Sequence, residues 1–113
     1  MIIKPVVTDG TAPVGTVQHV LAALSDPVRL EMVRRLMNAG GGPSPCARLY
    51  DGINKSTATH HFKALREAGV IERLVLDGQI HQRLRRDEVE AAVPGLLDAV
   101  VTAANREAAD PPS

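Results

Sequence analysis

The stretch KSTATHHFKALREAGVIER, from Lys55 to Arg73, decides the fold of this chain. Ala58, Phe62 and Leu65 recur at spacings of three to four residues, which predicts a helix with one buried face. The side chains expected on the opposite face are small polar or basic hydrogen-bond donors: Lys55, Ser56, Thr57, Thr59, His60 and Lys63. The major groove of DNA presents many acceptors between two rows of phosphates, so this polar face is typical of a helix that reads DNA.

A β-hairpin is expected directly after this helix. The helix should end at Gly69, and two strand-like runs follow over residues 70–76 and 79–84. The dipeptide Asp77-Gly78 lies between the two runs and is a strong signal for a two-residue turn. Arg83 and Arg85 are expected to reach the backbone or the minor groove of DNA from this hairpin.

Two helices are expected near the start of the chain. The first covers residues 16–24. Asp26 can cap the second, Pro27 suits its first helical position, and its apolar periodicity continues to about Asn38.

The segment between the second helix and the polar-faced helix is rich in glycine and proline. Residues 39–45 must form a loop, and a third, short helix is expected over residues 46–51. Ser56 is expected to cap the polar-faced helix that follows.

The chain is expected to end in one more helix. Asp87 can cap it, with Glu90 completing a capping-box pattern, and Pro94-Gly95 should interrupt it. Beyond the interruption lies an apolar stripe formed by Leu96, Leu97, Val100, Val101 and Ala104.

This order of elements predicts a mainly α-helical, winged helix-turn-helix fold with a small β-hairpin wing. Four helices come first, then two strands and a final helix. Residues 14–106 are expected to form the DNA-binding and dimerisation domain. Residues 1–13 are predicted to be a flexible N-terminal arm, and residues 107–113 a flexible tail.

The charges are segregated along the chain although the net charge is zero. Residues 48–86 carry eight basic and four acidic residues, a net of +4, whereas residues 87–113 carry one basic and six acidic, a net of −5. Phosphate binding depends on a local basic face, so the acidic end does not argue against nucleic acid. Tyr50 and Phe62 are the only aromatic side chains apart from histidine, which argues against RNA-binding modules with aromatic platforms.

The cysteine content and the hydropathy of the chain indicate the cellular compartment in which the protein is expected. The single cysteine, Cys46, excludes an intrachain disulfide and fits a reducing cytoplasm. No apolar run is long enough to span a bilayer, and Pro5 interrupts the N-terminal MIIKPVV too early for a secretory signal. A cytoplasmic protein without a membrane partner is predicted.

Three segments, in the same order, resemble the bacterial regulators of the ArsR/SmtB type. LAALSDPVRLEMVRRL at residues 21–36 is similar to their opening segment, and KSTATHHFKALREAGVIER is similar to their recognition-helix segment. The Asp77-Gly78 hairpin and the following LRRDEVEAAVPGLLDAVV also fit. The resemblance covers about residues 17–104. It implies a homodimeric transcriptional repressor that binds double-stranded DNA at a palindromic operator.

The resemblance also implies which residues meet a second subunit. In this family the first and last helices form the dimer interface. The residues at those positions here are Val17, Leu21, Leu96, Leu97, Val100 and Val101.

In many members a metal or metalloid ion releases the DNA, but neither familiar metal site is intact here. The Cys-x-Cys pair of the soft-metal sensors is reduced to Cys46, and the last helix lacks the histidines of the zinc sensors. His19 is the candidate ligand, together with acidic or histidine groups across the dimer, and nickel, zinc or cobalt would suit such a site. His60 and His61 are about 100° apart on a helix, so they are expected to face phosphate or to pack beneath the reading face.

Other signals and other classes stay open at this point. The regulator could instead respond to cysteine oxidation, a small organic ligand or a partner protein, or have no effector. A winged helix that binds only protein would be expected to carry apolar anchors on its reading helix. An enzyme is not expected, because no Gly-rich phosphate loop, nucleophile elbow or paired buried carboxylates accompany the histidines and Cys46.

Overall fold

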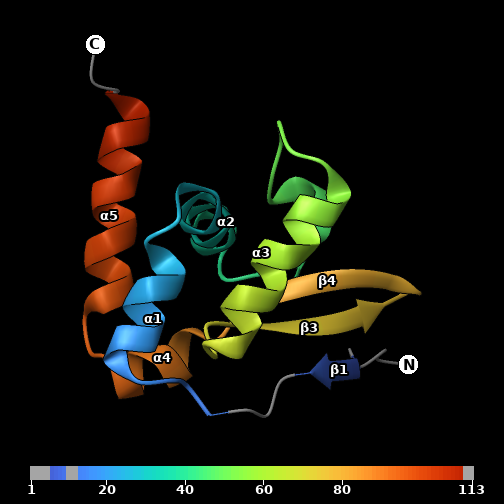
Figure 1. Cartoon of the computed structure of the whole chain (residues 1–113), viewed down its shortest axis with the longest axis horizontal. Coiled ribbons are helices and arrows are strands. Elements are labelled where there is room, and N and C mark those ends of the chain that lie inside the picture. The colour runs from blue at the N-terminus through green and yellow to red at the C-terminus, as the bar shows by residue number, and fades with distance from the viewer. Residues whose placement is uncertain (1–5, 10–12, 111–113) are drawn as a thin grey trace.

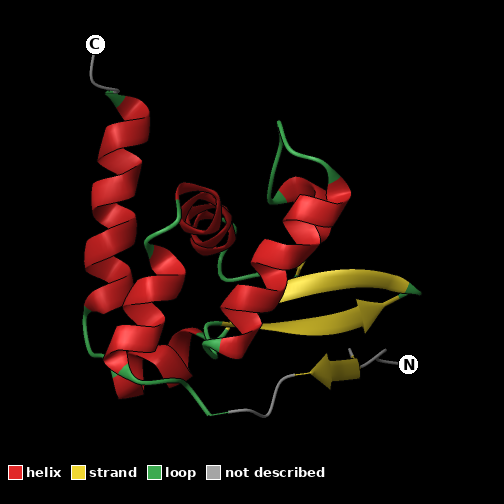
Figure 2. Ribbon diagram, in the orientation of Figure 1, coloured by secondary structure: helices red, strands yellow, loops and turns green. Residues whose placement is uncertain are grey.

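The structure, a computed structural model, describes residues 6–9 and 13–110. In this part the helices are α1 (Val17–Leu24), α2 (Pro27–Asn38), the short 3-10 helix η1 (Cys46–Arg48), α3 (Lys55–Glu67), α4 (Arg86–Ala92) and α5 (Leu96–Ala109). The strands are β1 (Val6–Asp9), β2 (Ser44–Pro45), β3 (Ile71–Leu76) and β4 (Gln79–Leu84). The helices lie together, and the β3–β4 hairpin projects away from them on the side of α3 (Figure 1, Figure 2). The predicted winged helix-turn-helix fold is confirmed.

The core is built from the apolar faces of the five α-helices and the base of the hairpin. α5 packs on α2, and α2 also contacts α1 and α3. The fully buried side chains include Val20, Met32, Leu36, Leu65, Ile71 and Leu97. Burial of apolar surface of this kind is the main favourable term in folding, so α3 is held at a fixed angle with its polar face outward.

The wing is an antiparallel sheet in the order β1-β3-β4-β2. Asp77 and Gly78 both have positive φ, 50° and 76°, which is the backbone of a type I′ turn. This two-residue turn fixes the register, so Glu72 lies opposite Arg83 and Arg73 lies opposite Gln82. Neighbouring residues of a strand point to opposite faces, and these two pairs therefore lie on different faces of the wing.

The capping predictions for α2 are confirmed. The Asp26 carboxylate accepts from the Val28 and Arg29 amides at 2.8 and 3.1 Å, and Pro27 is the first helical residue. Burial raises the pKa of Asp26, but the amide hydrogen bonds from Arg29 and Val28, together with the nearby side chains of His61 and Arg29, lower this pKa overall.

Two other capping predictions were wrong. Asn54, not Ser56, caps α3, because its side chain accepts from the Thr57 amide at 2.8 Å and the helix begins two residues earlier than a cap at Ser56 would allow. α4 begins at Arg86, so Asp87 lies inside its first turn, where a carboxylate still suits the helix dipole. The Glu90 carboxylate accepts instead from the Gly95 amide at 3.1 Å, at the predicted interruption.

The short third helix and the two ends of the chain also differ from expectation. Only the 3-10 turn η1 forms within residues 46–51, and β2 forms within the expected loop. Val6–Asp9 form strand β1 against β3, although an irregular arm was expected there. α5 continues to Ala109, into the expected tail. The other residues of the expected arm and tail, 1–5, 10–12 and 111–113, lie outside the described residues.

The segment before α1 docks on the end of α3. The Gly15 amide donates to the Ala68 carbonyl at 2.9 Å. Gly69 has a φ of +78°, and a Cβ there would lie 2.7 Å from the Val14 Cα. Glycine is therefore required at this helix end both for its backbone conformation and for the close approach of the chain.

None of the described helices is both long enough and apolar enough to cross a membrane.

Candidate nucleic-acid interface

The outward face of α3 carries the predicted row of donors. Ser56, Thr57, His60 and Lys63 are exposed, while Ala58, Phe62 and Leu65 on the opposite face are buried. Lys63 places its ammonium 3.9 Å from the exposed Glu67 carboxylate, a solvated pair that contributes little to stability. This row can therefore approach an acceptor-rich surface without first breaking a strong internal contact.

His61 does not belong to that row. Its side chain is 12% exposed, and its Nδ1 lies 3.2 Å from the Arg29 guanidinium and 3.8 Å from the Asp26 carboxylate. Arg29 in turn donates to the Ala23 carbonyl at 2.7 Å. His61 thus connects α3 to the start of α2, beneath the reading face, which is one of the two positions expected for the histidine pair.

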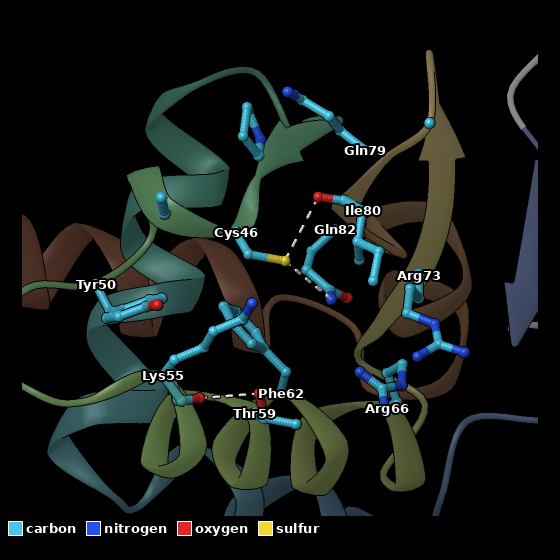
Figure 3. A pocket seen from close by; sticks show the side chains of 14 residues that line it. Cys46, Tyr50, Lys55, Thr59, Phe62, Arg66, Arg73, Gln79, Ile80 and Gln82 are labelled. Atoms are coloured by element: carbon cyan, nitrogen blue, oxygen red, sulfur yellow. Dashed lines mark hydrogen bonds between the residues drawn. The ribbon is translucent and has the colours of Figure 1, made fainter.

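Lys55 and Thr59 lie on the side of α3 that faces the wing. Thr59 donates its hydroxyl to the Lys55 carbonyl at 2.9 Å. Both residues line a cavity of about 610 Å³ between α3, η1 and the hairpin (Figure 3). They therefore adjoin the exposed row on one side and the cavity on the other.

The two wing arginines are less available than the sequence suggested. The Arg83 guanidinium is paired with the carboxylate of Glu72, whose side chain is only 6% exposed. Arg85 is half-buried and donates to the Gly69 carbonyl at 3.3 Å, so it anchors the hairpin to the end of α3. Contact of either arginine with DNA stays a prediction, and for Arg83 it would compete with an existing ion pair.

A charge cluster lies on the outer face of α2, the helix that packs against α3. Glu31 accepts from Arg34 and Arg35 at 2.8 and 2.7 Å, and Arg35 also reaches Asp51 at 2.8 Å. The Arg34 hydrogen bond, and after it that from Arg35, outweigh burial and lower the pKa of Glu31 to about 2. The cluster connects α2 to the turn before α3.

The predicted dimer-interface residues divide into two groups. Val17 and Leu21 on α1 are 52% and 47% exposed, whereas Leu97 and Val101 are 2% and 4% exposed. Leu96 and Val100 are half-buried. The resemblance placed all four of these α5 residues at a dimer interface, but α2 and its neighbours cover Leu97 and Val101 within one chain. These two residues are core, and a second subunit would contact their neighbours instead.

His19 is exposed on α1, and its amide donates to the Thr16 hydroxyl at 3.1 Å. Among residues 6–9 and 13–110, no group of three or more His, Cys, Asp or Glu side chains is placed to hold a metal ion. A metal site that uses His19 would therefore draw further ligands from a second subunit.

The side chains that connect the wing to α3 were not among the predicted site residues. Arg73 and Gln82 face each other across the hairpin and line the cavity, together with Arg66 of α3. The signal was present, because a turn at Asp77-Gly78 implies the pairing of residues 73 and 82.

Comparisons with known proteins agree with this geometry. A model of a helix-turn-helix domain family matches residues 24–73. The HTH-type transcriptional regulator YceK of Bacillus subtilis (strain 168) is 35% identical over 84 residues, which cover 73% of this chain and 83% of YceK. The crystal structure of the transcriptional repressor BigR from Xylella fastidiosa superposes with a TM-score of 0.60 at 34% identity, covering 77% of this chain and 84% of BigR. With a polar reading helix beside a β-hairpin wing, this chain belongs to the helix-turn-helix transcriptional regulators and is not an enzyme.

Proposed function

We propose that the protein is an ArsR-type repressor that binds a palindromic operator as a homodimer. The observation that carries this proposal is the exposed row of α3, Ser56, Thr57, His60 and Lys63, on a helix whose other face is buried. Hydrogen-bond donors match the N7 and O6 acceptors of guanine and the O4 acceptor of thymine in the major groove. The sequence similarity to ArsR/SmtB regulators and the structural similarity to the repressor BigR support the assignment.

The exposed apolar side chains of α1 support a dimer. Val17 and Leu21 lie one helical turn apart and are about half exposed, and α1 and α5 both pack on α2. An isologous interface between two copies would cover these side chains and place two α3 helices on one face. Two such helices, about one turn of DNA apart, would match a palindrome.

Selection from a random pool of double-stranded DNA tests the proposal. We expect the purified protein to enrich an inverted repeat with half-sites about 10 base pairs apart. The double variant His60→Ala and Lys63→Ala should lose this enrichment, while Arg106→Ala, a charge removal on the exposed side of α5, should retain it. If the wild-type protein enriches no sequence, the operator assignment is wrong.

A divalent metal effector is a further, separate proposal. Imidazole with carboxylate suits nickel, zinc or cobalt, and His19 is the available ligand on α1. An ion would release DNA only if it favoured one dimer geometry over another. Calorimetry of the dimer with each ion should give stoichiometric binding that His19→Ala removes, and binding unchanged by this substitution would exclude the site.

A further inference from the structure

We infer that the cavity between α3 and the wing is a binding site for a small organic acid that has an apolar body and a hydroxyl group. Its volume of about 610 Å³ falls within the range of known small-molecule sites, which are mostly apolar with a few placed polar groups. The apolar wall comes from Ala58 and Phe62 of α3 and Ile80 of β4. Figure 3 shows these elements enclosing the space from opposite sides.

One buried polar atom in this cavity lacks a partner. Gln82 is 1% exposed and lines the cavity, and its Oε1 accepts no hydrogen bond from the described residues. Its Nε2 donates to the Cys46 sulfur at 3.6 Å, which orients the amide. A buried acceptor without a donor is costly, so a ligand hydroxyl that donates to Oε1 would be favoured there.

The charge of the cavity selects an anion. Lys55, Arg66 and Arg73 line it, and none of the residues that line it in the described part of the chain is acidic. Arg73 lies directly opposite Gln82 in the hairpin, so one small molecule can meet both residues. A carboxylate near the arginines and a hydroxyl at Gln82 would fix the orientation of the apolar body between them.

Occupancy of this cavity would oppose DNA binding, a consequence that rests on the proposed function. Lys55 and Thr59 belong both to the predicted DNA contacts and to the cavity wall. An anion beside Lys55 and Arg66 would reduce the positive field that attracts phosphate. The small acid would therefore act as an inducer that releases the operator.

Three matched compounds test the binding site without DNA. Calorimetry should give a Kd for 6-hydroxy-2-naphthoate on the order of 100 μM or tighter. We expect 2-naphthoate, which lacks the hydroxyl, and 2-naphthol, which lacks the carboxylate, each to bind about tenfold more weakly. Equal binding of all three compounds, or no measurable binding of the hydroxy acid at millimolar concentration, overturns the proposal.

Variants locate the site. Gln82→Leu should remove the advantage of the hydroxy acid over 2-naphthoate, and Arg73→Gln should remove its advantage over 2-naphthol. Arg106→Gln makes the same charge change on α5 and should alter neither ratio. Because Gln82 is buried, its variant is first checked by thermal unfolding. If it does not fold, Arg73→Gln decides, and unchanged ratios in a folded variant overturn the site.

The single cysteine supplies an independent readout, because Cys46 lines the same cavity. The hydroxy acid should slow alkylation of Cys46 by monobromobimane several-fold, whereas inorganic phosphate at the same concentration should not. If phosphate protects Cys46 from alkylation equally well, the cavity is a binding site for a phosphate of the DNA backbone, and the proposal of an organic-acid site is overturned.

The regulatory step is measured last, on the operator found by selection. The hydroxy acid should weaken operator binding by the wild-type protein and not by Arg73→Gln. Unchanged operator affinity at saturating acid overturns the inducer role. Failure to find any operator removes the proposed function and leaves the calorimetric result standing by itself.

Discussion

Helices α3 and α5 have nearly equal lengths, 13 and 14 residues, and each buries one face in the same core. They differ in what they leave exposed. α3 exposes hydroxyl, imidazole and ammonium donors, whereas the exposed residues of α5 include the small side chains of Ala99, Thr102 and Ala103. Hydrogen-bond donors suit the acceptor-lined groove of DNA, whereas small side chains allow another helix to approach closely. Two helices of the same amphipathic design thus present different outer surfaces, and the proposed DNA contact and the proposed dimer contact would each use one of them.

The largest effect should come from the buried face of α5. Leu97→Glu places a charge at a position that is 2% exposed, so we expect a loss of about 3–5 kcal/mol in the free energy of unfolding. Circular dichroism during urea unfolding measures it. A Leu97→Glu variant with wild-type stability would show that α5 is detached from the core. In that case α5, unlike α3, would not bury one face in the core.

A substitution on α1 separates dimerisation from folding. Leu21→Glu changes a side chain that is 47% exposed, so the subunit should stay folded while the dimer weakens by at least tenfold in Kd. Sedimentation equilibrium measures the association. Gln79→Glu, which adds the same charge at an exposed position of the wing away from α1, is the matched control. A dimer unaffected by Leu21→Glu would place the interface elsewhere.

On α3, His60→Ala should reduce the discrimination between the selected operator and random DNA by about 1–3 kcal/mol, because it removes a donor to base edges. Lys63→Ala should weaken binding to all sequences and lower the salt slope by about one unit. Fluorescence anisotropy over a range of salt concentrations distinguishes the two. If both variants bind the operator like the wild type, α3 is not the reading helix.

The smallest effect concerns pH. Glu31 is about a third exposed and has a pKa of about 2 in the folded chain, below its usual 4.5. Its stabilisation is therefore present above about pH 4.5 and is lost as the pH falls towards 2, because protonation breaks the pairs with Arg34 and Arg35. After allowance for solvent screening we expect Glu31→Gln to cost about 1 kcal/mol at neutral pH. The variant and the wild type should converge in stability near pH 2; a difference that persists there would point to packing instead.

Local patterns in the sequence predicted most of the fold. The apolar spacing of Ala58, Phe62 and Leu65, the Asp26-Pro27 start and the Asp77-Gly78 turn each act over a few residues, and each formed as expected. The predictions that failed depend on distant contacts. Whether Leu97 is surface or core depends on the packing of α2, and the pairing of β1 depends on a strand more than 60 residues away along the chain.

Exposure was predicted correctly for those site residues whose position does not depend on contacts with other elements. Ser56, Thr57, His60 and Lys63 are exposed as expected. The inward turn of His61 and the pairing of Arg83 with Glu72 follow from neighbours on other elements. From helical periodicity, His61 could either face phosphate or pack beneath the reading face. Only the position of Arg29, on another helix, distinguishes the two.

Strand β1 has a consequence for the solution behaviour of the wing. It covers the edge of β3 with a strand of only four residues, and its register shifts between Val7 and Asp9. Short edge strands and bulges hinder the pairing of sheets from different molecules. A chain that begins after residue 12 would expose the longer, regular edge of β3, and it should form concentration-dependent edge-to-edge aggregates that the full chain avoids.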